Sequence, residues 1–243
     1  MKKLLATFLA FLLLSIPAWG ALEFDGNTGN VNVGDIAVLR PTSNFSLVCT
    51  LIPTTPDDYS CIVGFCLSGT SKGWLLDYDN APSLHWQCGA GAGWKSVSYN
   101  YTSGVKIVVI GVLDGDVPRL YINNALIGSA AVVTPVYTGC QFDIGKYYNH
   151  GAGSRYKGII WDLRFYDRVL SEAERATITY AQGNDKIVDG LVGWWRMDEK
   201  PSGVSAAGAG SVIDISGYSN SGTPVNNPVY RSSPTTIINP TMY

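Results

Sequence analysis

Charged residues are scarce in this chain, at 15% of its 243 residues. The formal net charge is −2, and 17 basic residues less Lys2 and Lys3 against 19 acidic ones give −4 without the N-terminal segment. A strongly basic face is therefore not expected, which argues against nucleic-acid partners and anionic membrane surfaces. Only two histidines are present, and the cysteine spacings match no zinc pattern, so a zinc site is not expected.

Long apolar runs are missing except at the start of the chain. Two lysines precede an apolar run from Leu4 to Ile16, and small residues follow at positions 18 and 20. This order predicts a secretory signal peptide over residues 1–20, cleaved near residue 20. The alternative, a transmembrane anchor, is disfavoured because a bilayer span needs about 20 apolar residues. We therefore expect residues 21–243 to form one secreted or periplasmic domain without membrane insertion.

Cysteines are few, and all five follow the predicted signal peptide. An exported chain enters an oxidising compartment, where disulfides form and persist. We expect two disulfide bridges and one free thiol, although the sequence does not fix the pairing. The alternative is that several are small buried side chains. The five are Cys49, Cys61, Cys66, Cys88 and Cys140.

Glycine and apolar residues are abundant, with 27 glycines, 12% aromatic residues and 46% apolar residues. This composition favours a turn-rich β protein with a sizeable core. Apolar and polar residues alternate in residues 45–51, and hairpins are predicted over 74–88 and 119–129. The strand predicted over 107–113 is apolar nearly throughout, which is typical of a strand covered on both faces.

One short helix is predicted, from Ser171 to near Ala181. Ser171 and Glu174 form a capping-box pattern, in which the serine oxygen accepts the Glu174 amide and the carboxylate reaches back. Many strands, tight turns and one helix predict an all-β, two-sheet antiparallel sandwich. Five tryptophans that alternate within the predicted strands are assigned mainly to its core: Trp74, Trp86, Trp161, Trp194 and Trp195.

Three segments resemble the concanavalin A-like lectin/glucanase superfamily, and within it the laminin-G-like jelly roll. They are Ser103–Ala130, Tyr156–Glu174 with "YKGIIWDLRFYDRVLSEAE", and Gly190–Pro224 with "GLVGWWRMDE" and "DISGYSNSG". The resemblance implies a two-sheet antiparallel jelly roll with one short helix.

The order of these segments is unusual, because the family's opening segment stands last here. This order predicts a circular permutation, in which residues 190–226 supply the usual first strands. A second copy cut short is the alternative, but about 50 residues would leave Trp194 and Trp195 without a core. The permuted arrangement makes the strand from Leu22 to Phe24 a neighbour of the C-terminal segment.

Catalysis is not expected. Glucanases in the superfamily carry paired glutamates on one strand, and retaining enzymes hold such carboxyl groups about 5–5.5 Å apart. This sequence has no matching pair, since Glu172 and Glu174 fall on the helix cap and Asp198 and Glu199 on a turn. A glycoside hydrolase is therefore the least favoured function.

A structural Ca²⁺ is implied by the resemblance, and oxygen ligands suit it. The "DISGYSNSG" loop offers Asp214, Ser216 and Asn220 within seven residues. The alternative is a turn that bonds its own backbone.

Sugar binding is a further hypothesis, because carbohydrate sites combine aromatic faces with polar groups. Two glycine-rich segments, Cys88–Tyr101 and Gly145–Tyr156, carry such residues. We therefore expect a secreted, non-catalytic module that binds a glycan or a cell-surface protein; the alternative is a structural or adhesion component of a cell envelope or virus-like particle. The candidate ligand-binding residues are Trp94, Tyr99 and Tyr101 in the first segment and Tyr147, Tyr148, Asn149, His150 and Arg155 in the second.

Overall fold

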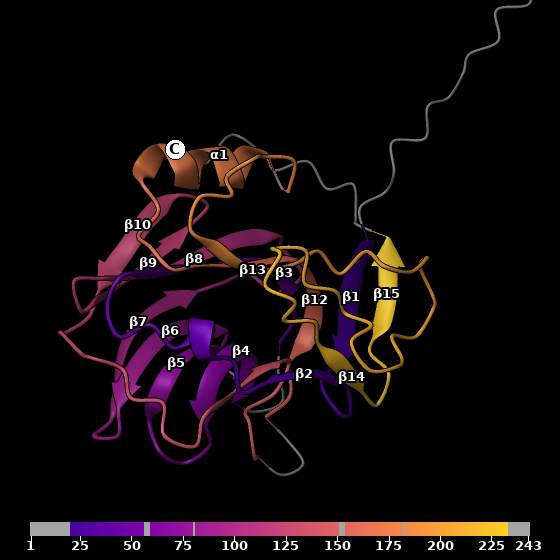
Figure 1. The fold of residues 1–243 in the computed structure, drawn as a ribbon, viewed down its shortest axis with the longest axis horizontal. Helices are drawn as coiled ribbons and strands as arrows, with labels where there is room; N and C mark the ends of the chain where they lie inside the picture. Colours follow the sequence, from indigo (N-terminus) through magenta and orange to yellow (C-terminus); the bar gives the residue numbers. More distant parts are fainter. Residues whose placement is uncertain (1–19, 56–58, 80, 151–153, 182, 233–243) are drawn as a thin grey trace, which may run out of the picture.

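The computed structural model describes residues 20–55, 59–79, 81–150, 154–181 and 183–232. Within these ranges, an eight-stranded and a seven-stranded antiparallel sheet face each other as two layers (Figure 1). One α-helix lies over the outer face of the eight-stranded sheet. The predicted all-β sandwich with a single helix is confirmed for the described part of the chain.

The eight-stranded sheet has the order β10-β9-β8-β3-β12-β1-β15, and β13 also pairs with β12. Two strands pair with the same edge of β12: β1 with its first half and β13 with its second half. The strands of this sheet are β1 (Gly20–Asp25), β3 (Phe45–Pro53), β8 (Ile107–Asp114), β9 (Val117–Ile122), β10 (Ala125–Ser129), β12 (Lys157–Tyr166), β13 (Leu191–Trp195) and β15 (Val229–Ser232).

The seven-stranded sheet has the order β14-β2-β11-β4-β5-β6-β7. Its second half, β4 to β7, is a meander in which each strand pairs with the next along the chain. A short 3₁₀ helix, η1 (Ala37–Leu39), follows β2. The strands are β2 (Asn30–Gly34), β4 (Ser60–Leu67), β5 (Lys72–Tyr78), β6 (Ser83–Ala90), β7 (Trp94–Asn100), β11 (Gln141–Ile144) and β14 (Thr223–Val225).

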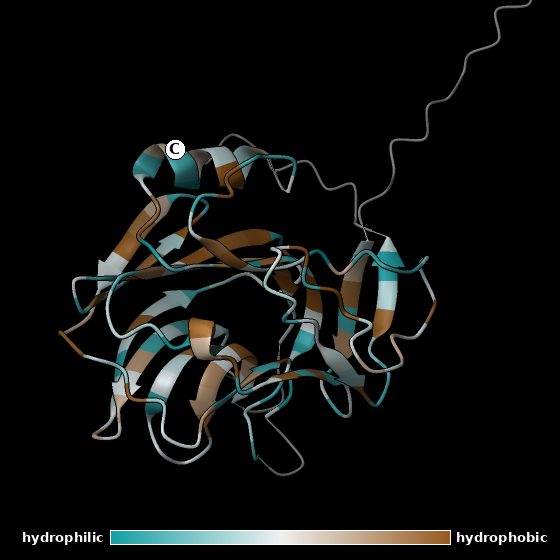
Figure 2. Ribbon diagram, viewed as in Figure 1, coloured by the Kyte–Doolittle hydropathy of each residue, from teal (hydrophilic) through white to brown (hydrophobic). Residues whose placement is uncertain are grey.

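Large aromatic side chains fill the space between the two sheets. Trp74 of β5 stacks on Phe165 of β12 with ring centroids 5.1 Å apart, and Phe45 of β3 stacks on Phe165 at 5.2 Å. Figure 2 shows the apolar colouring of β3 and β8, which cross the middle of the molecule. The core assignment is confirmed for four of the five predicted tryptophans, which are at most 4% exposed, whereas Trp194 is partly buried and packs on a second buried cluster.

The C-terminal segment joins both sheets. Strand β13 pairs with β12, β14 with β2 and β15 with β1. The expected contact between Leu22 and this segment is confirmed, since Leu22 pairs with Tyr230. The circular permutation and the domain boundaries stay predictions. The predicted signal peptide lies outside the described residues except for Gly20, which begins β1.

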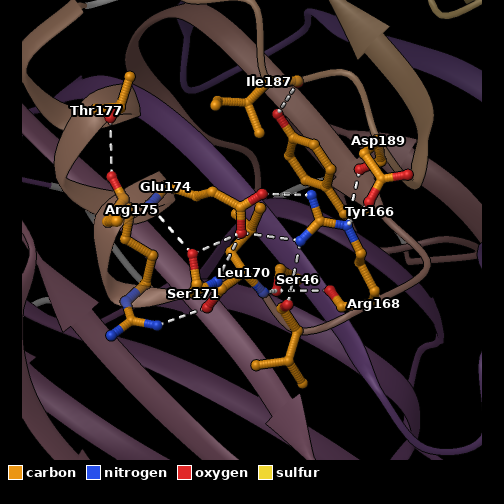
Figure 3. A network of polar contacts seen from close by, with 12 residues as sticks. Ser46, Tyr166, Arg168, Leu170, Ser171, Glu174, Arg175, Thr177, Ile187 and Asp189 are labelled. Atoms are coloured by element: carbon orange, nitrogen blue, oxygen red, sulfur yellow. Dashed lines mark hydrogen bonds and ion pairs between the residues drawn. The ribbon is translucent and has the colours of Figure 1, made fainter.

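Helix α1 (Glu172–Ala181) begins with the predicted capping box, which is confirmed (Figure 3). The Glu174 backbone N–H donates to Ser171 Oγ at 3.3 Å, and the Ser171 N–H donates to Glu174 Oε2 at 2.8 Å. Arg168 donates to the same carboxylate through Nη1 and Nη2, at 2.9 and 2.6 Å. This ion pair with Arg168, together with the bonds from Ser171, lowers the pKa of Glu174 to about 2. The helix N-terminus is thus tied to the end of β12.

All five cysteines are buried free thiols, so the expectation of two disulfide bridges is wrong for this structure. Cys49 and Cys88 belong to the central core, whereas Cys61 and Cys66 belong to a separate cluster with Leu75. Burial raises the pKa of Cys49, Cys61 and Cys88, which keeps these sulfurs protonated. They act as small apolar side chains.

No helix in the described ranges is long and apolar enough to cross a membrane.

Candidate ligand pocket

A pocket of about 230 Å³ opens on the outer face of the seven-stranded sheet. Two of its walls, Trp94 and Tyr147, pack on the buried cluster formed by Cys61, Cys66 and Leu75. This cluster is separate from the core between the sheets, so the pocket lies on the side of the sheet that faces away from the sandwich. The lining residues are Tyr59, Leu67, Ser68, Gly69, Trp94, Tyr147, His150 and Ser154.

Glycine makes room for the Trp94 ring. Trp94 pairs across the sheet with Gly89, and Gly89 pairs with Gly73. A Cβ atom at Gly89 would lie 2.8 Å from Trp94 Cε3 and 2.2 Å from the Ser71 carbonyl oxygen. The indole therefore lies against bare backbone, and a larger residue at position 89 would displace it.

The alternation of β7 separates the three aromatic residues predicted from its segment. Trp94 faces outwards, whereas Tyr99 packs against the central core from the inner face. Tyr101, just beyond the strand, is 5% exposed and donates from its hydroxyl to the Thr54 carbonyl oxygen at 3.1 Å. The prediction of Tyr99 and Tyr101 as ligand residues is therefore corrected: the segment is a strand rather than an open loop, and period two turns these side chains inwards.

The second predicted segment supplies Tyr147 and His150 to the pocket, with ring centroids 5.9 Å apart. The loop turns here, since the His150 N–H donates to the Tyr147 carbonyl oxygen and Asn149 has a φ of 57°. Asn149 is exposed, and neither it nor the partly buried Tyr148 lines the pocket. Arg155 also lies outside the lining, because its Nη1 donates to Asn30 Oδ1 at 2.8 Å.

A buried carboxylate fixes the Tyr147 wall from behind. Asp77 is 2% exposed, and Tyr147 donates its hydroxyl hydrogen to Asp77 Oδ2. Gln87 Nε2 lies 2.9 Å from both oxygens of Asp77, and His85 Nδ1 lies 3.2 Å from Oδ1. The bond to Asp77 raises the pKa of His85 against the opposing effect of burial. Ser96 extends the network by donating to Gln87 Oε1 at 2.7 Å.

Five lining residues were not among the predicted ones. Tyr59 lies directly before β4 and is 55% exposed. A single aromatic residue in a polar stretch does not show in the sequence whether its side chain is exposed. Leu67 ends β4, and Ser68 and Gly69 begin the turn to β5, where Thr70 Oγ1 donates to the Leu67 carbonyl oxygen at 2.8 Å. Their only signal was the Ser-Gly turn, which occurs throughout β proteins.

The predicted calcium residues form a turn bonded to its own backbone. Asp214 accepts the N–H of Trp194 and of Ser216 on Oδ1 and the N–H of Asn220 on Oδ2, each at 2.9 Å. Asn220 donates its side-chain amide to the Val192 carbonyl oxygen at 3.1 Å. These contacts account for the buried Asp214 side chain without a metal, and calcium binding here stays a prediction.

The two facing antiparallel sheets form a sandwich consistent with a jelly roll. A laminin-G-like family model, described as the concanavalin A-like lectin/glucanases superfamily, matches residues 25–174. The chain belongs to this superfamily. The match includes β7 and the loop with Tyr147, and it ends before β13. No curated protein sequence matches the chain.

Solved structures with the same fold include three proteins at low sequence identity. A protein from Bacteroides ovatus, described as a candidate carbohydrate-binding protein, has a TM-score of 0.70 and 17% identity over 90% of this chain and 61% of its own. The CBM40 of a Ruminococcus gnavus IT-sialidase, bound to α2,3-sialyllactose, has 0.55 and 17% over 65% and 96%. The botulinum neurotoxin serotype D binding domain has 0.51 and 16% over 67% and 42%. The chain thus spans about 61% of the length of the Bacteroides protein.

Proposed function

We propose that this chain is an exported, non-catalytic module that binds carbohydrate in the pocket between Trp94 and Tyr147. The observation that carries the proposal is the pair of aromatic walls, Trp94 on β7 and Tyr147 in the loop after β11, beside Ser68 and Ser154. Aromatic faces pack on the C–H faces of sugar rings, and a few fixed polar groups orient the hydroxyls. The carbohydrate-binding descriptions of two proteins with the same fold support this reading.

The acidic groups near the pocket support binding rather than hydrolysis. The two oxygens of Asp77 form hydrogen bonds with Gln87, Tyr147 and His85. This carboxylate therefore holds the pocket wall in place rather than acting on a ligand. Glu172 and Glu174 lie on the helix over the other sheet. A pair of carboxyl groups facing each other across a ligand is what a glycosidase needs.

A glycan array followed by calorimetric titration tests the proposal. Trp94→Ala should weaken the best glycan at least tenfold, about 1.4 kcal/mol, because one face of the sugar loses its support. Tyr59→Ala and Tyr218→Ala form a matched pair, since these side chains are 55% and 54% exposed and only Tyr59 lines the pocket. Affinity should fall for the first variant and stay unchanged for the second.

Two results would contradict the proposal. Glycan binding that survives Trp94→Ala unchanged would place the sugar elsewhere. Failure of every glycan to bind, together with a solution mass above that of a monomer, would favour the structural or adhesion role. Export is tested separately by the mass of the mature product, which should begin near residue 21.

A further inference from the structure

The described walls of the pocket hold no counter-ion for an acidic ligand. Among the eight lining residues that the structure describes, none is Lys, Arg, Asp or Glu. A carboxylate that leaves water without a partner costs far more free energy than a hydroxyl group does. Entry of an acidic sugar therefore depends on the charges that lie behind the walls.

A negative group lies directly behind the Tyr147 wall. Tyr147 donates its hydroxyl hydrogen to Asp77, which is 2% exposed. His85 lies between two carboxylates, with Nδ1 3.2 Å from Asp77 Oδ1 and Nε2 3.7 Å from Asp79 Oδ2. Even a protonated His85 offsets only one of these two charges, so the group stays negative. Its field repels an anion in the pocket, and burial of Asp77 limits screening by salt at the source.

Two lysines on the strands beside the pocket are directed to the opposite side of the sheet. Lys95 follows the outward-facing Trp94 on β7 and pairs with Cys88, which lies in the central core. Lys72 lies beside Cys140 of the same core, since its charge opposes the rise to about 11 that burial causes in the pKa of this thiol. Neither lysine lines the pocket. The alternation of the strands thus keeps these cations away from a ligand.

The cations that flank the Tyr147 loop lie beside another carboxylate. Lys146 and Arg155 pair with each other through their backbones. Burial raises the pKa of Asp143 to about 6, and the charges of Lys146 and Arg155 oppose this rise, so both lie close to Asp143. Arg155 Nη1 also donates to Asn30 Oδ1 at 2.8 Å. Neither cation lines the pocket.

We propose that the pocket between Trp94 and Tyr147 selects uncharged sugars over sugars that carry a carboxylate, such as uronic and sialic acids. Neutral hydroxyl groups meet the neutral side chains of Ser68 and Ser154, whereas a carboxylate meets the field of Asp77 without a cation on the wall. This inference rests on the proposed carbohydrate-binding function and names the ligand class of the same site.

Calorimetric titration of the wild-type protein with matched glycosides tests the inference. Methyl glucoside is compared with methyl glucuronide, and methyl galactoside with methyl galacturonide, because each pair differs only in a neutral or an ionised group at C6. In each pair that binds, the neutral member should bind at least about threefold tighter at low salt, a difference of about 0.7 kcal/mol. This ratio should shrink as the salt concentration rises from about 0.05 M to about 0.5 M, because mobile ions screen the repulsion.

Removal of the charge behind the wall tests its source. Asp77→Asn keeps an acceptor for the Tyr147 hydroxyl and removes the negative charge, so the preference for the neutral sugar should shrink even where both affinities fall. Asp189→Asn is the matched control, because it removes the same charge from a side chain that is 90% exposed beside Arg168, next to helix α1 (Figure 3). The preference should stay unchanged in this control.

A cation on the wall gives a test that leaves the buried carboxylate in place. Ser68→Lys adds a positive charge at a partly buried lining position, whereas Ser68→Gln adds a neutral side chain. The uronide should gain affinity relative to its neutral partner in the lysine variant only. An equal change in both variants would overturn the inference.

The outcomes separate this inference from the proposed function. A uronide that binds as tightly as its neutral partner at low salt, or a preference that neither salt nor Asp77→Asn reduces, would overturn the inference and leave sugar binding standing. A panel in which no sugar binds below about 10 mM, a free energy near −2.7 kcal/mol, would overturn both.

Discussion

The hydroxyl of Tyr147 donates a hydrogen bond to the carboxylate of Asp77, 70 residues earlier in the chain. This bond joins a loop to the end of β5 and fixes one wall of the pocket. Asp77 is buried, so the bond is made where water does not compete and where an unpaired acceptor is costly. The position of the wall therefore depends on a residue that is not part of the pocket lining.

Tyr147→Phe removes this hydroxyl and keeps the ring. We expect the free energy of unfolding to fall by about 1–3 kcal/mol, because a buried carboxylate loses one of its donors. Sugar affinity should fall as well, since the wall is no longer fixed. Urea denaturation and calorimetry measure the two effects. Tyr148→Phe is the matched control, and an equal loss there would show that the effect is not due to Asp77.

The pH dependence of stability should report on His85. Asp77 raises the pKa of His85, with Asp79 adding to the effect. A histidine with a raised folded pKa contributes its full stabilisation below the unfolded value of about 6.5, and this contribution is lost as the pH rises through the folded pKa. The wild type should therefore lose more stability than His85→Gln between pH 6 and pH 9, as measured by urea denaturation at each pH. Parallel curves for the two proteins would contradict this assignment.

The capping box of α1 should give stability the opposite pH dependence. The pKa of Glu174 is lowered to about 2, so its contribution is present above the unfolded value of about 4.3 and is lost as the pH falls towards 2. Glu174→Gln should cost about 1 kcal/mol at pH 7, a value typical of a lost helix cap, and less at pH 2.5. Glu172→Gln, in the same helical turn, is the control and should cost only a few tenths of a kcal/mol. Equal costs for both would mean that the Arg168 contact adds nothing.

Much of the sandwich could be predicted because its signals are local. The alternation in β3, the hairpins and the Ser171–Glu174 pair each depend on residues close in sequence. The pocket is different, because Trp94, Tyr147 and Tyr59 come from three separate segments that only the sheet order brings together. Within β7, the same rule of alternation that found the strands would have turned Tyr99 inwards if the segment had been read as a strand.

The free cysteines show that an expected oxidising compartment is not enough to predict disulfide bridges. An exported chain is free to form disulfides, but pairing needs Cα atoms within about 7 Å and suitable directions. Cys49 and Cys88 lie in the core between the sheets, whereas Cys61 and Cys66 lie together on the opposite face of the second sheet, because the register of β4 shifts between Cys61 and Val63. Spacing along the chain holds no information on such faces once strands from distant segments pair.

Trp195 tests whether the C-terminal segment completes the core. It is fully buried, its ring centroid lies 5.2 Å from that of Phe142, and its Nε1 donates to the Asn220 carbonyl oxygen at 3.0 Å. Trp195→Ala should lower the free energy of unfolding by about 3–5 kcal/mol, the range for large buried aromatics. Tyr218→Ala, an exposed aromatic in the same segment, should change it by less than about 0.5 kcal/mol. A small loss at Trp195 would mean that the segment is not part of the main core.

Asp214 distinguishes a turn from a calcium site. Its carboxylate accepts three backbone N–H groups, from Trp194, Ser216 and Asn220, so it holds the end of β13 to the following loop. Asp214→Ala should cost more than about 2 kcal/mol in any buffer, because three donors lose a charged acceptor. Calcium bound by Asp214, Ser216 and Asn220 would add a second effect: the melting temperature of the wild type, but not of Asp214→Ala, would rise with calcium concentration. Equal melting temperatures in calcium and in chelator, with the variant still destabilised, would leave the turn as the whole role of Asp214.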